Sequence, residues 1–285
     1  MKKTALLFAG QGAHRVGMGK DLAEASPAAR AALDRANAVV GYDLVNICWN
    51  GPETELTKTE HAQPGIYLAS WLAFEALKEG VPELAFGATA GLSLGEYAAL
   101  TAAGTLRFED GLRLVRRRGL FMQEACEGTP GAMAAVIGMP EPAVHALCSE
   151  TGVQIANVNC PGQIVIAGEA GAIQRACELA KASGAKKTSP LTVAGAFHSK
   201  LMAPAQPKLA AELAQCRFAE PAVPVISNVT ARPHGAASEI PALLVEQVVS
   251  TVRWEESMRY LIAHGFTRGV DLGPGDDPVD RGRGG

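Results

Sequence analysis

The serine in Gly91-Leu92-Ser93-Leu94-Gly95 has the sequence setting of a nucleophile. A Gly-x-Ser-x-Gly element is typical of a sharp strand-to-helix turn that exposes one serine hydroxyl, and the glycines leave room for the tight backbone. A short apolar run precedes Ser93 and an Ala-rich helical stretch, 96–103, follows it. A helix N-terminus favours developing negative charge. The pattern therefore predicts a nucleophilic serine, with two glycines beside an ordinary buried turn as the alternative.

A nucleophilic serine needs a base, and His198 is the best candidate among the six histidines. It lies in the segment 195–199, directly after a predicted strand and among small residues that suit the wall of a pocket. His145, on a predicted helix, and His234, in a loop with proline and glycine, are expected at the surface. We interpret His198 as the base, with a packed core histidine as the alternative.

Arg118 lies where a charged side chain is not expected. In a helix of 3.6 residues per turn, it falls in the middle of an apolar arc formed by Leu114, Val115, Gly119, Phe121, Met122 and Ala125. A guanidinium there must find a partner, because an unpaired buried charge is very costly. Two interpretations stay open, a buried salt bridge or a bidentate clamp for a substrate carboxylate. Together with Ser93, the clamp suggests acyl groups that carry a free acid.

The order of serine before histidine suits an α/β-hydrolase, which would also place an acidic residue between them. The His-Gly-Gly-Gly loop found in lipases of that fold is absent from the sequence. Gly10-Gln11-Gly12, at the end of the first predicted strand, is a candidate oxyanion loop, because a glutamine beside tight backbone supplies hydrogen-bond donors. By itself this tripeptide is a weak signal.

Strand and helix patterns alternate along the chain and predict a two-part α/β protein. Residues 1–127 and 194–275 form a large α/β-hydrolase-like domain with a parallel sheet, and residues 128–193 read as an inserted ferredoxin-like (βαββαβ) subdomain. Residues 276–285 contain one apolar side chain, Val279, and are expected to be a disordered tail. The expected strands are 4–9, 85–90, 132–138, 153–159, 163–168, 186–193, 223–228 and 270–272, and the expected helices are 19–40, 65–78, 96–103, 108–124, 140–150, 170–184, 203–215 and 243–252.

The composition narrows the function classes. The 285 residues are 48% hydrophobic and 19% charged, which suits a packed core rather than disorder. A net charge of −3 without a dominant basic patch argues against a nucleic-acid partner. No run of apolar residues is long enough to cross a membrane. Six scattered cysteines without a Cys-x-x-Cys pair are expected to be reduced thiols, so we predict a cytoplasmic protein without a metal.

Many ordered motifs in the chain resemble the malonyl-CoA:acyl carrier protein transacylases of fatty-acid or polyketide synthesis. The resemblance covers about residues 4–275 and is highly specific because the motifs occur in the family's order. The matching segments are 8–12, 63–64, 93–97, 118–119, 122–125, 131–135, 157–159, 161–163, 197–199, 224–225, 227–229 and 273–275, with Gln247 seven residues before Trp254.

The resemblance implies a ping-pong acyl transfer through malonyl-O-serine at Ser93, with His198 as the base and no cofactor. It also implies that Gln11 and the backbone N–H of Leu94 form the oxyanion hole and that Arg118 holds the malonyl carboxylate. The backbone carbonyl of Gln247 would orient the histidine in place of an acid. Phe197, Gln63 and Asn159 would line the substrate pocket. The implied partners are malonyl-CoA and the phosphopantetheine arm of acyl carrier protein, with no nucleic acid and no membrane.

Two features depart from the family pattern, and two other functions stay open. Leu92 stands where the family commonly has histidine, although leucine also occurs there in relatives. Residues 276–285 stand where relatives continue with an apolar helical segment. A serine esterase or thioesterase fits Ser93 and His198 equally well, but Arg118 less well, because ordinary esters carry no carboxylate. A non-catalytic carrier-binding scaffold would be expected to lack the nucleophile or the base.

Overall fold

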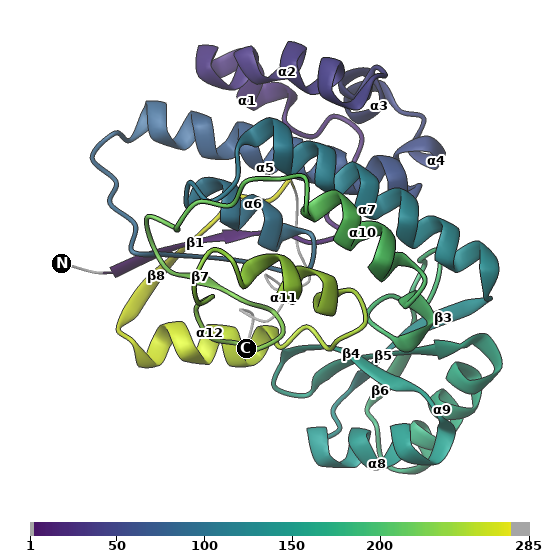
Figure 1. Cartoon of the computed structure of the whole chain (residues 1–285). Helices are drawn as coiled ribbons and strands as arrows, with labels where there is room; N and C mark the ends of the chain where they lie inside the picture. The colour runs from purple at the N-terminus through teal and green to yellow at the C-terminus, as the bar shows by residue number, and fades with distance from the viewer. Residues whose placement is uncertain (1–2, 275–285) are drawn as a thin grey trace.

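Two four-stranded sheets organise the chain, one parallel and one antiparallel (Figure 1). The computed structural model describes residues 3–274, so the predicted disordered tail, 276–285, lies outside the described residues. This arrangement agrees with the mixed α/β class expected from the sequence. The assignment of the larger part to the α/β-hydrolase-like fold and of the smaller part to the ferredoxin-like fold stays a prediction at this point.

The parallel sheet has the strand order β7-β2-β1-β8 and forms the centre of the larger part. Its strands are β1 (Lys3–Phe8), β2 (Ala88–Gly91), β7 (Val225–Ile226) and β8 (Phe266–Asp271). Every residue of β2 is buried, as expected for an inner strand of a parallel sheet covered on both faces. Because the strands are parallel, the loops after β1, β2 and β7 leave the sheet at the same edge.

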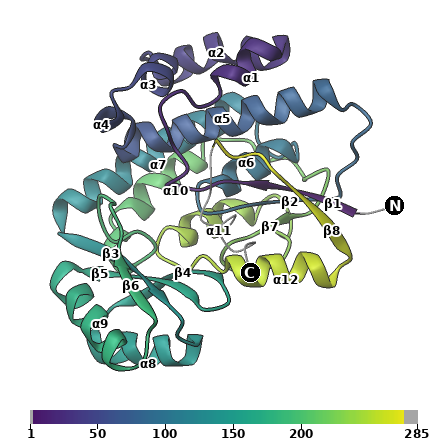
Figure 2. The ribbon, with the colours of Figure 1, turned by 180° about the vertical axis from the view of Figure 1, so that it is seen from behind.

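Helices cover both faces of the parallel sheet. In Figure 1, α5 and α7 lie side by side over one face, α1, α2 and α3 form a further layer beyond them, and α12 lies across the opposite face. Figure 2 shows the same layers from behind. No helix within residues 3–274 is both long and apolar enough to cross a bilayer. The helices of this part are α1 (Lys20–Ala25), α2 (Pro27–Val40), α3 (Leu44–Asn50), α4 (Glu53–Leu56), α5 (Thr59–Gly80), α6 (Gly95–Ala102), α7 (Phe108–Gly128), the 3₁₀ turn η1 (Lys200–Met202), α10 (Ala205–Leu213), α11 (Ile240–Gln247) and α12 (Trp254–Ala263).

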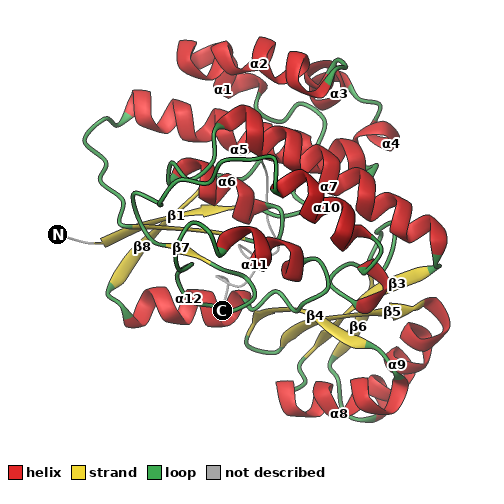
Figure 3. Cartoon of the chain, viewed as in Figure 1, coloured by secondary structure: helices red, strands yellow, loops and turns green. Residues whose placement is uncertain are grey.

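The smaller part is an antiparallel sheet with two helices on one face, as Figure 3 shows. Its elements follow in the order β3 (Gly131–Ile137), α8 (Glu141–Thr151), β4 (Gln154–Cys160), β5 (Gln163–Glu169), α9 (Ala170–Ala182) and β6 (Lys187–Pro190). The strand order is β4-β5-β3-β6, and a separate apolar core lies between the sheet and the helices. Val252 ties this sheet to the larger part, because it exchanges backbone hydrogen bonds with Val158 (3.0 Å) and Ala156 (2.8 Å) of β4.

Two of the expected helices begin or divide differently in the structure. The segment 19–40 is two helices, because the Ser26 side chain accepts a hydrogen bond from the Ala29 N–H and Pro27 starts α2. The helix expected from residue 65 begins at Thr59 and runs through Pro64. Pro64 cannot donate to the carbonyl of Glu60, and the Tyr42 hydroxyl donates to that oxygen instead, at 3.4 Å.

Three helices, α3, α4 and α12, were not predicted from the sequence, and α11 lies a few residues before its predicted position. The helix expected over 243–252 covers Ile240–Gln247, and Pro241 lies in its first turn, where proline is favoured. The first two missed helices are only seven and four residues long, so tertiary packing outweighs their local pattern. In α12 the buried residues Trp254, Ser257 and Leu261 follow helical spacing, so this helix was overlooked although its pattern is amphipathic.

The turn between β2 and α6 can be built only with glycine at two positions. A Cβ atom at Gly91 would lie 2.0 Å from the backbone of Gly95, and a Cβ at Gly95 would lie 2.4 Å from the carbonyl oxygen of Phe8. Real carbon atoms do not approach backbone this closely. The missing side chains therefore let α6 start directly against the ends of β1 and β2.

We predict that Gly95→Ala lowers the free energy of unfolding by about 3 kcal/mol, because the rigid Phe8 carbonyl has no room to retreat. Denaturant unfolding followed by circular dichroism measures this change. Gly128→Ala is the matched control, since a Cβ there meets no atom within 4 Å, and it should change stability by less than about 0.5 kcal/mol. Equal stability of the two variants would contradict the steric account of the turn.

Candidate active site

Ser93 lies in the turn between β2 and α6 with a left-handed backbone conformation, φ 54°. This conformation is uncommon for a residue with a side chain and is often found at functional sites. The side chain of Asn228, in the loop after β7, holds the turn. Its Oδ1 accepts a hydrogen bond from the Ser93 N–H at 2.6 Å, and its Nδ2 donates to the Gly91 carbonyl at 2.7 Å.

His198 contacts Ser93 directly, although the two residues are 105 positions apart in the sequence. Its Nε2 lies 2.7 Å from the Ser93 Oγ, and its Nδ1 lies 2.9 Å from the backbone carbonyl oxygen of Gln247. A carbonyl only accepts, so the ring proton must be on Nδ1 and the Nε2 lone pair faces the serine hydroxyl. The histidine is therefore held in the tautomer that a general base requires. Like Ser93, it has a positive φ, 57°.

Arg118 of α7 is fully buried, and no carboxylate among residues 3–274 forms a salt bridge with it. Its Nη1 donates to the side-chain oxygen of Gln63 at 2.8 Å, and its Nη2 donates to the Ser93 Oγ at 3.0 Å and to Gln247 Oε1 at 2.9 Å. The guanidinium also lies 5.7 Å from the centre of the Tyr97 ring. Its Nε–H finds no acceptor within the described part of the chain. The salt-bridge interpretation raised by the sequence is therefore wrong for the described residues, because neutral oxygens and a ring hold the cation.

Burial and charge shift the titration of both groups beside the serine. Desolvation lowers the pKa of His198 to about 4, and the positive charge of Arg118 adds to that decrease. Burial also lowers the pKa of Arg118, while Tyr97 and Glu96 oppose that shift. An arginine nevertheless remains charged at neutral pH. The site thus pairs a neutral histidine with a permanent cation on either side of one hydroxyl.

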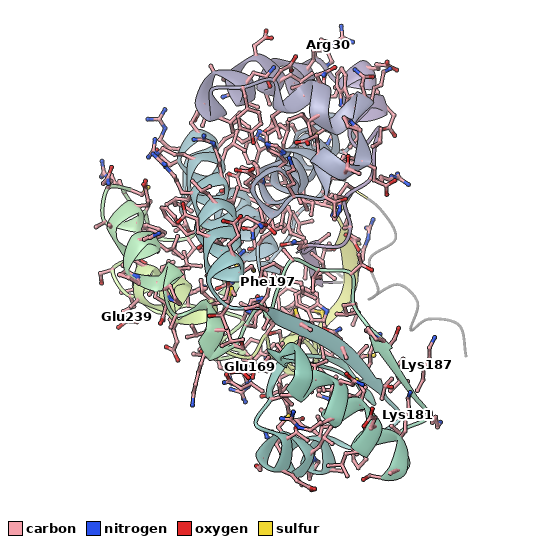
Figure 4. The ribbon with its side chains drawn as sticks, turned by 90° about the vertical axis from the view of Figure 1, so that its right-hand side faces the viewer. Arg30, Glu169, Lys181, Lys187, Phe197 and Glu239 are labelled. Atoms are coloured by element: carbon pink, nitrogen blue, oxygen red, sulfur yellow. The ribbon has the colours of Figure 1, made fainter. Side chains whose placement is uncertain are left out.

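A cavity of about 130 Å³ opens onto the Ser93 hydroxyl, between the two parts of the molecule. Figure 4 shows Phe197 at this junction, whereas Lys181 and Lys187 lie far out on the smaller part. The walls are mostly apolar, with polar groups from Gln11, Asn157 and Asn159, and the Oδ1 of Asn159 has no partner within residues 3–274. The lining residues are Gln11, Leu92, Ser93, Met122, Met133, Asn157, Asn159, Val165, Leu191, Val193, Phe197 and His198.

The remaining predicted residues lie behind or beside this wall. Arg118, Gln63 and Gln247 are buried behind the cavity wall. They connect to the wall by hydrogen bonds, from Arg118 Nη2 to the Ser93 Oγ and from Gln63 Nε2 to Gln11 Oε1 at 3.5 Å. Leu94 is also buried, and it is the N-cap of α6 directly after Ser93. The structure therefore brings all nine predicted residues into one connected region.

His234 was expected at the surface, and this expectation is wrong. Its side chain is fully buried and its Nε2 lies 2.7 Å from the Oε1 of Glu96. The proline and glycine around His234 mark a loop, but this loop folds inward against α6, where a buried carboxylate needs a partner. His145, by contrast, is exposed as expected. Neither Glu96 nor Asn228 was singled out, because their partners lie more than 130 positions away in the sequence.

The described residues suggest neither a metal centre nor a disulfide framework. Within residues 3–274 no group of three or more His, Cys, Asp or Glu side chains is arranged to hold a metal ion. All six cysteines, which lie in this range, are free thiols. The region therefore places one hydroxyl between a neutral histidine and a buried cation, beside an apolar cavity.

Comparison with known proteins places this geometry in context. The acyl transferase domain family matches residues 5–275. A malonyl CoA-acyl carrier protein transacylase from Bacillus subtilis (strain 168) is 46% identical over 282 residues, which cover 96% of this chain and 88% of the relative. Its name agrees with the resemblance recognised from the motifs.

Solved structures agree with the sequence relatives. The malonyl CoA-acyl carrier protein transacylase from Coxiella burnetii superposes with a TM-score of 0.94 at 36% identity, covering 98% of this chain and 89% of that one. A type II polyketide-synthase acyl carrier protein in complex with its malonyl-transacylase gives a TM-score of 0.91 at 39% identity, covering 96% and 89%. The match therefore extends over nearly the whole chain.

The shifted titration of His198 leads to a prediction. In the parent protein the ring should titrate near pH 4, and Arg118→Met should raise the midpoint, because the repulsion by the guanidinium is removed while the larger desolvation effect remains. Histidine-selective NMR between pH 2.5 and 8 measures both midpoints, and circular dichroism at each pH checks that the fold is retained. Arg117→Met, which removes a half-exposed neighbour paired with Glu212, is the control and should leave the midpoint unchanged. A parent midpoint near 6.5 would contradict this account.

Proposed function

This chain belongs to the acyl transferase domain family, and we propose that it transfers a malonyl group from malonyl-CoA to the phosphopantetheine thiol of acyl carrier protein. One observation carries the proposal. The Ser93 hydroxyl lies between a base, His198 Nε2 at 2.7 Å, and a cation, Arg118 Nη2 at 3.0 Å, that is buried without a carboxylate partner in the described chain. A substrate that brings both an activated acyl group and a carboxylate complements this arrangement. The names of the relatives support the same substrate and acceptor.

In the first half of the proposed reaction, the Ser93 Oγ attacks the thioester carbonyl of malonyl-CoA. Its proton passes to His198 Nε2, and the carbonyl oxygen becomes an oxyanion that Gln11 and the Leu94 N–H stabilise. When the tetrahedral intermediate collapses, the C–S bond breaks and the CoA sulfur leaves with the proton from His198. The product is malonyl-O-serine at Ser93.

In the second half, the carrier thiol gives its proton to His198 and attacks the serine ester. Collapse of the second tetrahedral intermediate returns the proton to the Ser93 Oγ and leaves malonyl-thioester on the carrier. The order is ping-pong, because the malonyl group stays on Ser93 after CoA leaves and before the carrier thiol attacks. The Gln247 carbonyl keeps His198 in the tautomer that both proton transfers require.

Arg118 is the proposed site for the malonyl carboxylate. Its planar fork matches a carboxylate, and a buried charge-assisted pair is strong. Because Arg118 now donates to Ser93, Gln63 and Gln247, it must exchange part of these bonds when the substrate binds. Gln63, Asn159 and Phe197 would complete the pocket around the short acyl chain.

We extend the proposal to the architecture. The turn with Ser93 between β2 and α6 supports an α/β-hydrolase-like larger domain, made of residues 1–127 and 194–275. The element order from β3 to β6 and the strand order β4-β5-β3-β6 support a ferredoxin-like subdomain over residues 128–193. The catalytic cavity would then lie between the two.

A serine esterase or thioesterase is the alternative, since Ser93 and His198 fit hydrolysis equally well. Intact mass spectrometry after incubation with malonyl-CoA separates the possibilities. We predict one malonyl adduct that persists in water and disappears when acyl carrier protein with its phosphopantetheine thiol is added. Ser93→Ala should show no adduct. An adduct that water removes as fast as the carrier does would favour the esterase, and an undiminished adduct in Ser93→Ala would exclude Ser93 as nucleophile.

The role of Arg118 gives a separate prediction. Arg118→Ala should lower the ratio of kcat/KM for malonyl-CoA over acetyl-CoA by about 100-fold, because only malonyl carries the carboxylate that the guanidinium pairs with. Arg118→Lys should keep only part of the preference, since a lysine cannot form the bidentate pair. Steady-state rates with the two thioesters on the same preparation give the ratio. If Arg118→Ala kept the parent ratio, the carboxylate clamp would be wrong.

A further inference from the structure

A buried acid–histidine pair lies behind the site and has no part in the reaction described above. Glu96 is on α6, three residues after the nucleophile, and His234 follows β7. Their side chains are 1% and 0% exposed, and His234 Nε2 lies 2.7 Å from Glu96 Oε1. A carboxylate held this deep in the protein is costly unless its oxygens are fully engaged.

The second oxygen of Glu96 is engaged by the residues that shape the site. Oε2 accepts from the side-chain Nε2 of Gln247 at 2.7 Å and from the backbone N–H of Asn228 at 3.1 Å. Asn228 is the residue whose side chain holds the nucleophile turn at Ser93 and Gly91. One carboxylate thus fixes both the loop that carries Asn228 and the amide of Gln247.

The amide of Gln247 has only one possible orientation in this network. Its Nε2 donates to Glu96 and to the Ser93 carbonyl oxygen, at 2.9 Å, and both of these atoms only accept. Its Oε1 must therefore point the other way, where it accepts from Arg118 Nη2 at 2.9 Å. The carboxylate of Glu96 decides which end of this amide faces the guanidinium.

The ring of His234 completes the arrangement. Its Nδ1 has no hydrogen-bond partner within residues 3–274. A doubly protonated ring would leave a charged N–H unpaired there, so the geometry favours a neutral ring whose single proton is on Nε2 and is donated to Glu96. Glu96 then keeps its negative charge, one amide away from the positive charge of Arg118.

We propose that the Glu96–His234 pair is a positioning device for carboxylate selection. It orients the Gln247 amide and the Asn228 loop, so that Arg118 is presented to the substrate at a fixed distance from the Ser93 hydroxyl. Glu96 carries a negative charge that balances the positive charge of Arg118, but it does not bind the guanidinium. The guanidinium is therefore free to bind the carboxylate of a substrate. This inference rests on the proposed malonyl transfer.

The test measures selectivity rather than activity. The ratio of kcat/KM for malonyl-CoA over acetyl-CoA is taken within one preparation, so a variant that folds only in part still reports it. Glu96→Gln, which removes the charge, and His234→Leu, which removes the donor, should each lower the ratio by about 10-fold or more, because a small misplacement of a substrate-orienting group has large kinetic effects. His234→Gln offers an amide donor at a similar reach and should keep the ratio within about threefold of the parent.

The control is the exposed His–Glu pair on α8. His145 Nε2 lies 3.5 Å from Glu141 Oε1 at the surface, and His145→Leu should leave the ratio unchanged. A parent without a malonyl adduct on Ser93 would mean that the proposed function fails. A parent that forms the adduct, together with an unchanged ratio in Glu96→Gln or His234→Leu, would overturn the positioning role alone. Equal losses in His234→Leu and His234→Gln would also overturn it, because the donor would then not matter.

Discussion

The guanidinium of Arg118 is the group around which the site is built. A buried cation without a carboxylate partner is expensive, so the protein must satisfy its donors by other means. Here two amide oxygens, from Gln63 and Gln247, and one hydroxyl, from Ser93, accept from it. Neutral acceptors meet the hydrogen-bonding demand without cancelling the charge. The cation therefore stays available to a negative group that arrives from outside.

The guanidinium of Arg118 acts on both His198 and Ser93. It lowers the pKa of His198, which makes the ring a weaker base but keeps it neutral at physiological pH. The guanidinium also donates a hydrogen bond from Nη2 to the Ser93 Oγ, and this bond stabilises negative charge on the oxygen when the hydroxyl loses its proton. Arg118, with its Nη2 placed 3.0 Å from the Ser93 Oγ, thus makes the His198 ring a weaker base and the Ser93 hydroxyl more acidic.

Local sequence pattern was enough to single out Ser93 and Arg118, whose side chains the structure brings together. Ser93 could be found because its flanking glycines are demanded by steric contacts that no other residue tolerates. Arg118 could be found because a charge in an apolar helical arc contradicts its neighbours. The burial of His234 could not be found, since its reason is a partner, Glu96, 138 positions away. Asn228 was hidden in the same way, because a short polar loop residue gives no local sign of which turn it holds.

In the fold, too, some elements follow from local pattern, whereas others depend on tertiary contacts. The strands β1 and β2 follow apolar runs and were expected close to their observed places, whereas α12 was missed although its buried residues follow helical spacing. Helix α5 begins earlier than expected because Tyr42 donates to the Glu60 carbonyl that Pro64 leaves without a partner. Local pattern thus predicts most of the elements, and tertiary contacts adjust where they begin and end.

The central claim is that Arg118 holds the substrate carboxylate beside the nucleophile. The most direct measurement is a crystal structure of the protein trapped as its malonyl adduct on Ser93. The account predicts that the malonyl carboxylate lies within about 3 Å of two guanidinium nitrogens of Arg118, with the ester carbonyl oxygen facing Gln11 and the Leu94 N–H. A carboxylate that points to solvent, with Arg118 still bonded to Gln63 and Gln247 as in the free protein, would contradict it.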